Sequence, residues 1–84
     1  MSAMKKQSID RFGEKLRDLR TRQNMTLKEL ANALGHVAHG HISEIETGKK
    51  MPTVEFVIKV AYLFNVTTDQ LLKDDLELEL DDDK

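Results

Sequence analysis

The sequence predicts an all-α protein, a bundle of five short helices. Along several segments apolar side chains recur every three or four residues with charged side chains between them, which is the pattern of amphipathic helices. Residue types that favour helix starts and helix ends lie at the boundaries of these segments. Before residue 75 no segment alternates apolar and polar residues as a half-buried strand does.

The first predicted helix starts after Ser8, whose hydroxyl can cap it. Polar residues, Lys15 among them, separate its apolar positions and are expected to face solvent. The apolar face consists of residues three or four positions apart: Ile9, Phe12, Leu16 and Leu19.

Two further helices follow, joined by a tight turn. Thr26 and Glu29 stand three residues apart and form a capping box, which predicts a second helix over residues 27–34 that Gly35 ends. Ile42 and Ile45, with polar neighbours, indicate a third and shorter helix. Its end is expected at residues 47–48, because glycine readily takes the left-handed conformation of a helix end.

The fourth and fifth helices complete the bundle. Proline at residue 52 pushes the residue before it out of helical geometry, and Thr53 can cap the helix that follows. Residues 65–68 form another cap, before a brief fifth helix over residues 69–73 whose Leu71 and Leu72 close the core. The predicted apolar face of the fourth helix is Val54, Val57, Val60, Ala61 and Phe64.

Charge divides the 84-residue chain unevenly. Residues 74–84 carry seven acidic residues and one lysine, so residues 1–73 hold twelve basic and eight acidic residues, a net charge of +4. We expect a flexible N-terminus over 1–7, a folded domain over 8–73 and an acidic tail over 74–84. The tail's leucines fit either a helix or a strand, and it either frays or contacts another protein. A basic body suits a polyanionic partner.

Composition excludes several classes of protein. The chain has no cysteine, hence neither disulfides nor thiolate metal sites, and this agrees with a reducing cytoplasm. Its start lacks the apolar core of a signal peptide, and no uncharged apolar run approaches the ~20 residues that span a bilayer. We therefore expect a cytoplasmic protein that does not contact membranes.

The detailed order of these residues resembles a known family. The segments LRDLRTRQNMTLKELANALG, HISEIETGKKMP and VIKVAYLFNVTTDQLL, which lie between residues 16 and 72, are similar to the helix-turn-helix domain of the phage repressor and Cro type, also called the XRE family. The resemblance implies a lambda-repressor-like fold. It also implies a sequence-specific regulator of transcription, a repressor rather than an activator, that binds double-stranded DNA and needs no cofactor.

Within this family the N-terminal part of the third helix enters the DNA major groove, which admits a single helix. Because Ile42 and Ile45 must face inward, the other side chains of that helix are expected to point outward. A carboxylate such as Glu44 can accept a hydrogen bond from cytosine N4. The alternative is a face that is merely solvated. The candidates for reading base edges are His39, Gly40, His41, Ser43 and Glu44.

Other contacts follow from the same resemblance. The candidates for binding phosphate are Thr26, Leu27 and Lys28 at the start of the second helix and Lys49 and Lys50 after the third. Arg20 and Glu46 occupy positions where relatives carry a salt bridge between the first and third helices; the alternative is two separately solvated charges.

The chain also departs from the family pattern. Six residues rather than five separate Gly35 from Ile42, with His36 the expected insertion, and Ala38 stands where a capping serine is common. Leu27 stands where relatives often carry a phosphate-binding glutamine. These departures bear on individual contacts and not on the fold.

Surplus apolar residues on the fourth helix predict a partner surface. We expect a two-fold homodimer whose interface includes Phe56, Leu63, Leu72 and Leu76, although some of these side chains could instead close the monomer core. Two-fold symmetry would place two recognition helices about 34 Å apart and require a near-palindromic operator.

The sequence also suggests three rival functions: metal binding, catalysis and binding of a toxin. His36, His39 and His41 lie close in sequence, but their spacing does not aim three rings at one metal ion, so no metal site is expected. Ser43 beside a histidine lacks the concave pocket of an enzyme, so no catalysis is expected. The main alternative is an antitoxin, a DNA-binding protein of this kind that also binds a toxin through its tail.

Overall fold

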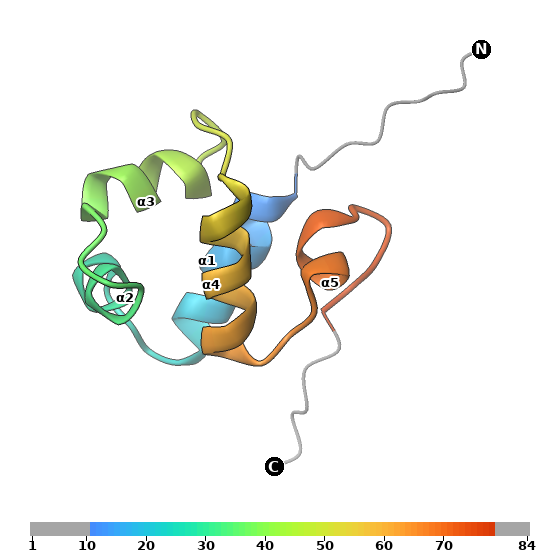
Figure 1. The fold of residues 1–84 in the computed structure, drawn as a ribbon, viewed down its shortest axis with the longest axis horizontal. Helices are drawn as coiled ribbons and strands as arrows, with labels where there is room; N and C mark the ends of the chain where they lie inside the picture. The colour runs from blue at the N-terminus through green and yellow to red at the C-terminus, as the bar shows by residue number, and fades with distance from the viewer. Residues whose placement is uncertain (1–10, 79–84) are drawn as a thin grey trace.

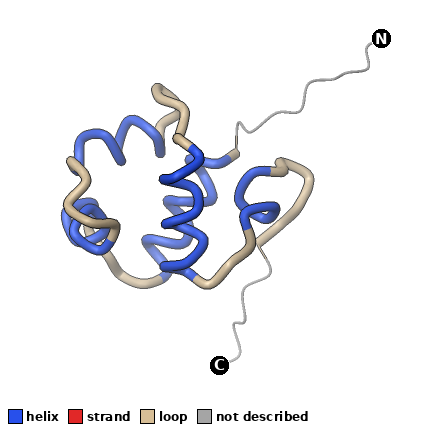
Figure 2. The backbone as a smooth tube through the Cα atoms, in the orientation of Figure 1, coloured by secondary structure: helices blue, strands red, loops and turns tan. Residues whose placement is uncertain are grey.

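The computed structural model describes residues 11–78, and within that range the chain forms helices joined by loops and turns, without a strand. Figures 1 and 2 show the bundle, with α2 and α3 at one end and α5 at the other. The prediction of an all-α fold is therefore confirmed. The five helices in this range are α1 (Phe12–Arg22), α2 (Leu27–Ala33), α3 (His39–Glu46), α4 (Val54–Phe64) and α5 (Thr68–Leu72).

Side-chain caps explain where most helices begin. The predicted capping box is present at α2: Thr26 accepts from the Glu29 amide, and the Glu29 carboxylate accepts from the Thr26 amide. Thr53 accepts from the amide of Phe56 at the start of α4. In contrast, α1 begins at Phe12 without a side-chain cap from its N-cap residue. Ser8 and Ile9, expected to start this helix, lie outside the described residues.

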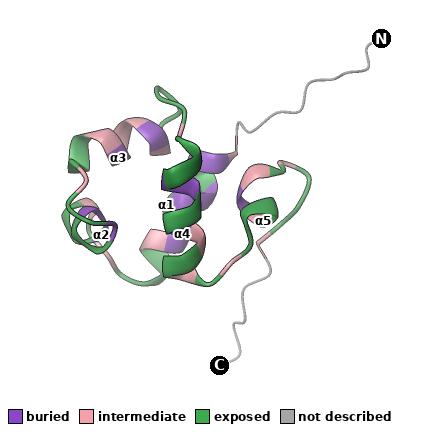
Figure 3. Ribbon diagram, in the orientation of Figure 1, coloured by how far each residue is buried: buried purple, intermediate pink, exposed green. Residues whose placement is uncertain are grey.

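The core lies where α1 meets the other helices. Figure 3 shows buried residues facing inward on each helix. α3 packs against α1 and α2, and α5 packs against α1 and α4. Each residue of this core exposes less than a tenth of its surface to solvent. The core residues are Phe12, Leu16, Leu19, Leu30, Ala31, Leu34, Ile42, Ile45, Phe56, Val57, Val60 and Leu71.

The predicted apolar face of α4 is wrong in its first turn. Val54 is 76% exposed, whereas Phe56 is only 6% exposed and its ring meets that of Phe12 edge to face at 6.2 Å between centroids. Val54 is the first residue of α4, directly after the exposed cap residue Thr53, and its side chain is left in solvent. Phe56 therefore belongs to the monomer core and is not available for the dimer interface in which it was expected.

The predicted solvent position of Lys15 is also wrong. This side chain is 2% exposed, and its ammonium donates to backbone carbonyls in residues 70–76. Burial lowers the pKa of Lys15 below its ordinary value.

Among the residues that the structure describes, no helix has the length and apolarity needed to cross a bilayer.

Candidate nucleic-acid interface

The turn between α2 and α3 is tightened by two consecutive residues with left-handed backbone. Gly35 has a φ of +95° and His36 a φ of +68°. The amides of His36 and Val37 both donate to the carbonyl of Ala31, at 2.9 and 3.1 Å. The extra residue expected at His36 is thus accommodated inside the turn, where it closes the end of α2. This geometry fixes the direction in which the chain enters α3.

The N-terminal end of α3 has few constraints. Ala38 is the N-cap residue, and no side-chain cap bond forms there. His39 and Gly40, in the first turn, are both exposed. A Cβ built on Gly40 would meet no other atom within 4 Å. Figure 1 shows this end of α3 at the outer edge of the molecule, above α2.

The polar side of α3 follows the expected arrangement except at one position. Ile42 and Ile45 are 0% and 1% exposed, as predicted, and Ser43 and Glu44 on the other side are half-buried. His41 does not point outward as expected. Its ring is half-buried and lies edge to face against Phe56, with 6.2 Å between the ring centroids. Because Phe56 is a core residue, His41 is turned toward α4 and away from the polar side.

The C-terminal end of α3 is held firmly by α1. Nε of Arg20 donates to Glu46 at 2.8 Å and Nη2 donates to the other carboxylate oxygen at 3.2 Å, so the expected salt bridge is present and bidentate. Nη1 of Arg20 donates to the carbonyl of Met25 at 2.8 Å. The two charged side chains are only 13% and 5% exposed.

Gly13 permits the close approach of α1 to this end of α3. A Cβ built on Gly13 would collide with the carbonyl oxygens of Ile45 and Glu46. Any larger residue would push the two helices apart. We did not identify Gly13 from the sequence, although a glycine inside a helical pattern is a known sign of close packing.

The loop after α3 folds back on the helix end. The amides of Lys49 and Lys50 donate to the carbonyl of Glu44 at 2.8 and 3.2 Å, while both lysine residues are exposed. Gly48, with a φ of +85°, makes this return possible. The two lysine side chains thus extend from a loop adjoining α3, and exposed ammonium groups of this kind can contact backbone phosphates.

The start of α2 differs from what was expected of a phosphate site. Lys28 is exposed and Leu27 is half-buried against the core. Glu29, however, places its carboxylate on the Thr26 amide, at 2.8 Å. A negative charge already interacts with this helix N-terminus, and a phosphate would have to share the position with it. The capping pattern in the sequence predicts the role of Glu29 as a cap but not the competition between its charge and a phosphate.

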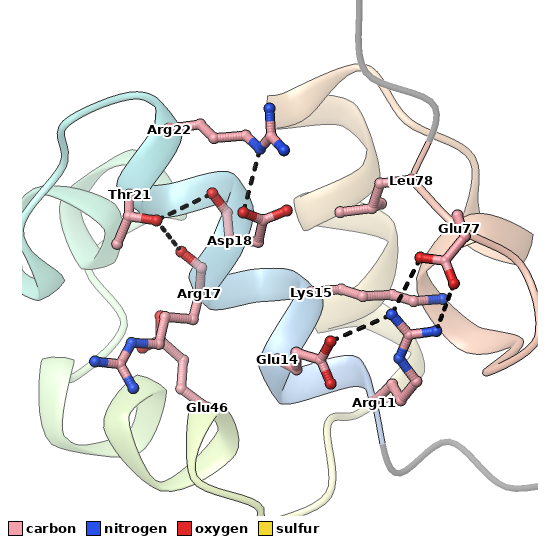
Figure 4. A pocket seen from close by; sticks show the side chains of 10 residues that line it. All are labelled: Arg11, Glu14, Lys15, Arg17, Asp18, Thr21, Arg22, Glu46, Glu77 and Leu78. Carbon is pink, nitrogen blue, oxygen red and sulfur yellow. Dashed lines mark hydrogen bonds and ion pairs between the residues drawn. The ribbon is translucent and has the colours of Figure 1, made fainter.

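A second surface, on α1, carries mixed charge. A groove of about 650 Å³ lies between α1, the end of α3 and residues 77–78. Figure 4 shows that two of its three arginines contact acidic neighbours: Arg11 pairs with Glu14 and Glu77, and Arg22 with Asp18. The whole lining holds four basic side chains (Arg11, Lys15, Arg17 and Arg22) and four acidic ones (Glu14, Asp18, Glu46 and Glu77). Since these charges balance one another, the groove has no excess of positive charge to attract a polyanion. Within residues 11–78 no group of three or more histidine or acidic side chains is placed to hold a metal ion.

Comparison with known proteins gives consistent results. A family model described as helix-turn-helix, HTH_3, matches residues 16–71. The chain is 43% identical over 61 residues to the HTH-type transcriptional activator BcrR of Enterococcus faecalis. The matched segment covers 73% of this chain and 29% of that protein. The chain thus spans less than a third of the length of this curated relative.

Solved structures show the same fold. The N-terminal DNA-binding domain of SinR from Bacillus subtilis superposes with a TM-score of 0.71 at 29% identity, over 81% of this chain and 99% of that one. The P22 c2 repressor, solved with a synthetic operator, superposes with a TM-score of 0.69 at 26% identity, over 76% of this chain and 96% of that one. The lambda-repressor-like fold is therefore confirmed.

Proposed function

The chain belongs to the helix-turn-helix family HTH_3, a non-enzymatic family of DNA-binding transcriptional regulators, and we propose that it reads a specific operator with α3 as a homodimer. The expectation that the chain is not an enzyme agrees with this membership. The P22 c2 repressor, similar in fold, was solved on operator DNA, which supports the same kind of partner here.

One observation carries the proposal: α3 is anchored along one side and at one end only. Ile42 and Ile45 bury its apolar side, and Glu46 fixes its last turn. Its first turn, with His39 and Gly40, is exposed. An exposed helix start with short or polar side chains suits insertion into the major groove.

The chemistry of this face supports direct reading of base edges. The carboxylate of Glu44 would accept from the N4 amino group of cytosine, and His39 would donate to guanine. Gly40 would allow the helix backbone to approach the groove closely, since it lacks a side chain. Ser43 lies beside them and can pair with any base. Lys49 and Lys50 would bind phosphates and position the helix.

Exposed apolar side chains support a dimer. Leu63 on α4 and Leu76 after α5 are 39% and 38% exposed, and Leu72 on α5 is half-buried, with part of its side chain packed against the core. Tyr62 is 84% exposed and Ile58 44%. A second copy that covers this surface by two-fold symmetry would bring two α3 helices to a near-palindromic operator in the cytoplasm.

We propose repression by occlusion of the promoter as the mode of regulation. The description of the E. faecalis relative as an activator favours the opposite sign. A reporter gene with the operator either overlapping the promoter or just upstream of it separates the two. Repression predicts loss of expression with the overlapping operator and no gain with the upstream one, whereas a gain from the upstream position would establish activation.

Selection from a random DNA pool tests the central proposal. The protein should enrich a near-palindromic motif, and Glu44→Ala should relax the preference at one position in each half-site, with a loss of about 1 to 3 kcal/mol in discrimination. Glu55→Ala is the matched control, because Glu55 is an exposed acid on α4. A pool without a common motif, or a uniform loss over all sequences with Glu44→Ala, would contradict direct base reading.

A further inference from the structure

A single buried ammonium holds the segment that follows α5. Lys15 is 2% exposed, and its Nζ donates to the carbonyl oxygens of Gln70 at 2.6 Å, Lys73 at 2.8 Å and Leu76 at 2.6 Å. An ammonium group has three donors and no acceptor, so these bonds use its full capacity. Lys15 therefore joins the middle of α1 to a stretch of chain more than fifty residues away.

One of these carbonyls, that of Gln70, lies in the last turn of α5, which ends at Leu72, and the last carbonyls of a helix have no intrahelical amide partner. The other two lie beyond the helix, and the carbonyl of Lys73 also accepts from the amide of Leu76, at 3.1 Å. A cation at a helix C-terminus also interacts favourably with the helix dipole. The three hydrogen bonds and the interaction with the dipole compensate for the free-energy cost of taking the charged ammonium out of water. The ammonium thus acts as the cap of α5, supplied by a different helix.

Arg11 attaches the same segment at a second point. Its amide donates to Oδ1 of Asp74 at 3.0 Å, and its Nη1 donates to the carbonyl of Asp74 at 2.8 Å. Its guanidinium also contacts both carboxylate oxygens of Glu77, at 3.0 and 3.2 Å, and this hydrogen bond lowers the pKa of Glu77. We refer to Arg11 and Lys15, with residues 70–77 that they hold, as the clasp.

α1 therefore makes two kinds of contact. Through Gly13 and Arg20 it touches the end of α3, and through Arg11 and Lys15 it holds residues 70–77. We propose that Lys15 is a positioning residue that fixes Leu72 and Leu76 in one orientation relative to α3, and so sets the spacing of the two recognition helices in the dimer. This inference rests on the proposed homodimer, and its test can be separated from it.

The link from Lys15 to the dimer surface is short. The carbonyl of Leu76 accepts from Lys15, while the side chain of Leu76 is 38% exposed on the proposed interface. Leu72 lies one residue before Lys73, whose carbonyl is also held. If the clasp opened, these leucines would keep their apolar surface but lose a fixed direction. Two copies could still associate, yet their α3 helices would no longer meet DNA at one separation.

Spin-label distances test the clasp without DNA. The chain has no cysteine, so pairs of introduced cysteines are labelled cleanly. The pair His39→Cys and Asp75→Cys spans α3 and the clasp, whereas His39→Cys and Arg17→Cys spans α3 and α1. In the otherwise unchanged protein both pairs should give narrow distance distributions. Lys15→Met should broaden the first distribution and leave the second unchanged.

Two results would overturn the inference: an unchanged 39–75 distribution in Lys15→Met, or equal broadening of both pairs, which indicates general loosening. If circular dichroism shows that Lys15→Met does not fold, the same distances are measured in Arg11→Gln, which then tests the clasp. The Arg11 side chain is 31% exposed, so its loss leaves the core intact. It should broaden the 39–75 distribution by a smaller amount, and no broadening there would contradict the clasp.

Operator spacing tests the consequence for DNA. On duplexes whose half-sites are separated by one base pair more or less than the selected motif, the unchanged protein should lose about tenfold in affinity. Lys15→Met should lose that preference while its affinity for one isolated half-site stays the same. If Lys15 had a merely structural role, Lys15→Met would weaken binding to the full operator and to the isolated half-site alike. An unchanged protein without any spacing preference would refute the homodimer, and the spin-label distances would still decide the clasp.

Discussion

The two ends of α3 are built in opposite ways. At the C-terminal end, Glu46 is 5% exposed and bonded to Arg20, and Gly13 brings the backbone of α1 against the last turn. At the N-terminal end, Ala38 offers no side-chain cap, and His39 and Gly40 are exposed. The helix is held at one end and open at the other. In the function proposed above, stability and DNA contact thus depend on different turns of the same short helix.

This division has a physical reason. A side chain that reads a base edge must leave its hydrogen-bonding groups free, so it cannot also fasten the helix to the bundle. An eight-residue helix is too short to be stable alone and depends on its packed face. Because Ile42, Ile45 and Glu46 anchor the apolar side and the last turn, His39 and Gly40 at the start of the helix stay exposed. The predictions below test whether the two ends can be changed independently.

The largest effect is expected from Arg20→Met. This change leaves the Glu46 carboxylate unpaired at 5% exposure and removes the bond to the Met25 carbonyl, so the free energy of unfolding should fall by about 3 kcal/mol. Urea unfolding measures it. The double variant Arg20→Met with Glu46→Met is the control and should regain much of the loss, because no buried charge remains. A loss below 1 kcal/mol, on the order of a surface pair, would show that this end is not anchored as described.

The next effect is expected from Gly13→Ala. Its new Cβ would collide with two backbone carbonyls that cannot rotate away, so the helices must separate, at a cost of about 2 kcal/mol or more in stability. Denaturant unfolding measures the loss. DNA affinity should fall as well, because the direction of α3 changes. If Gly13→Ala is as stable as the unchanged protein, α1 and α3 do not approach as closely as the structure shows.

The sequence predicted local features well. The capping box at Thr26 and Glu29 and the buried positions Ile42 and Ile45 depend on neighbours within four residues, which a pattern can display. The pair Arg20 and Glu46 came from family resemblance, since residues 26 apart carry no periodic signal.

Contacts between distant segments could not be predicted in this way. Periodicity predicts which side of a helix is apolar but not which helix will cover it, so it places Phe56 among the candidates for a dimer interface and His41 on the outward, base-reading side of α3. Lys15 interacts with carbonyls that exist only once α5 has ended beside α1. Gly13 is explained only by the backbone of α3 lying against it.

A smaller effect, on DNA binding, is expected from Lys49→Ala combined with Lys50→Ala in the loop that follows the C-terminal end of α3. Both lysines are exposed, so folding should be unaffected. DNA affinity should fall by roughly fivefold at low salt, and the slope of log affinity against log salt should decrease by about 2. The control is Lys59→Ala with Lys73→Ala, which removes the same charge elsewhere. Equal losses in the two double variants would mean that net charge, rather than the loop beside α3, supplies the attraction.

The sharpest contrast with Gly13, and only a small effect on stability, is expected from Gly40→Ala. Here a new Cβ meets nothing within 4 Å, and alanine favours a helix over glycine by up to about 1 kcal/mol, so thermal unfolding should shift slightly upward. DNA binding should weaken all the same, because the methyl group occupies the surface that approaches the groove. The same substitution would then be harmful to folding at one end of α3 and harmful only to binding at the other. Unchanged operator affinity in Gly40→Ala would show that the first turn stays clear of the DNA, and the contrast between the two ends would lose its functional meaning.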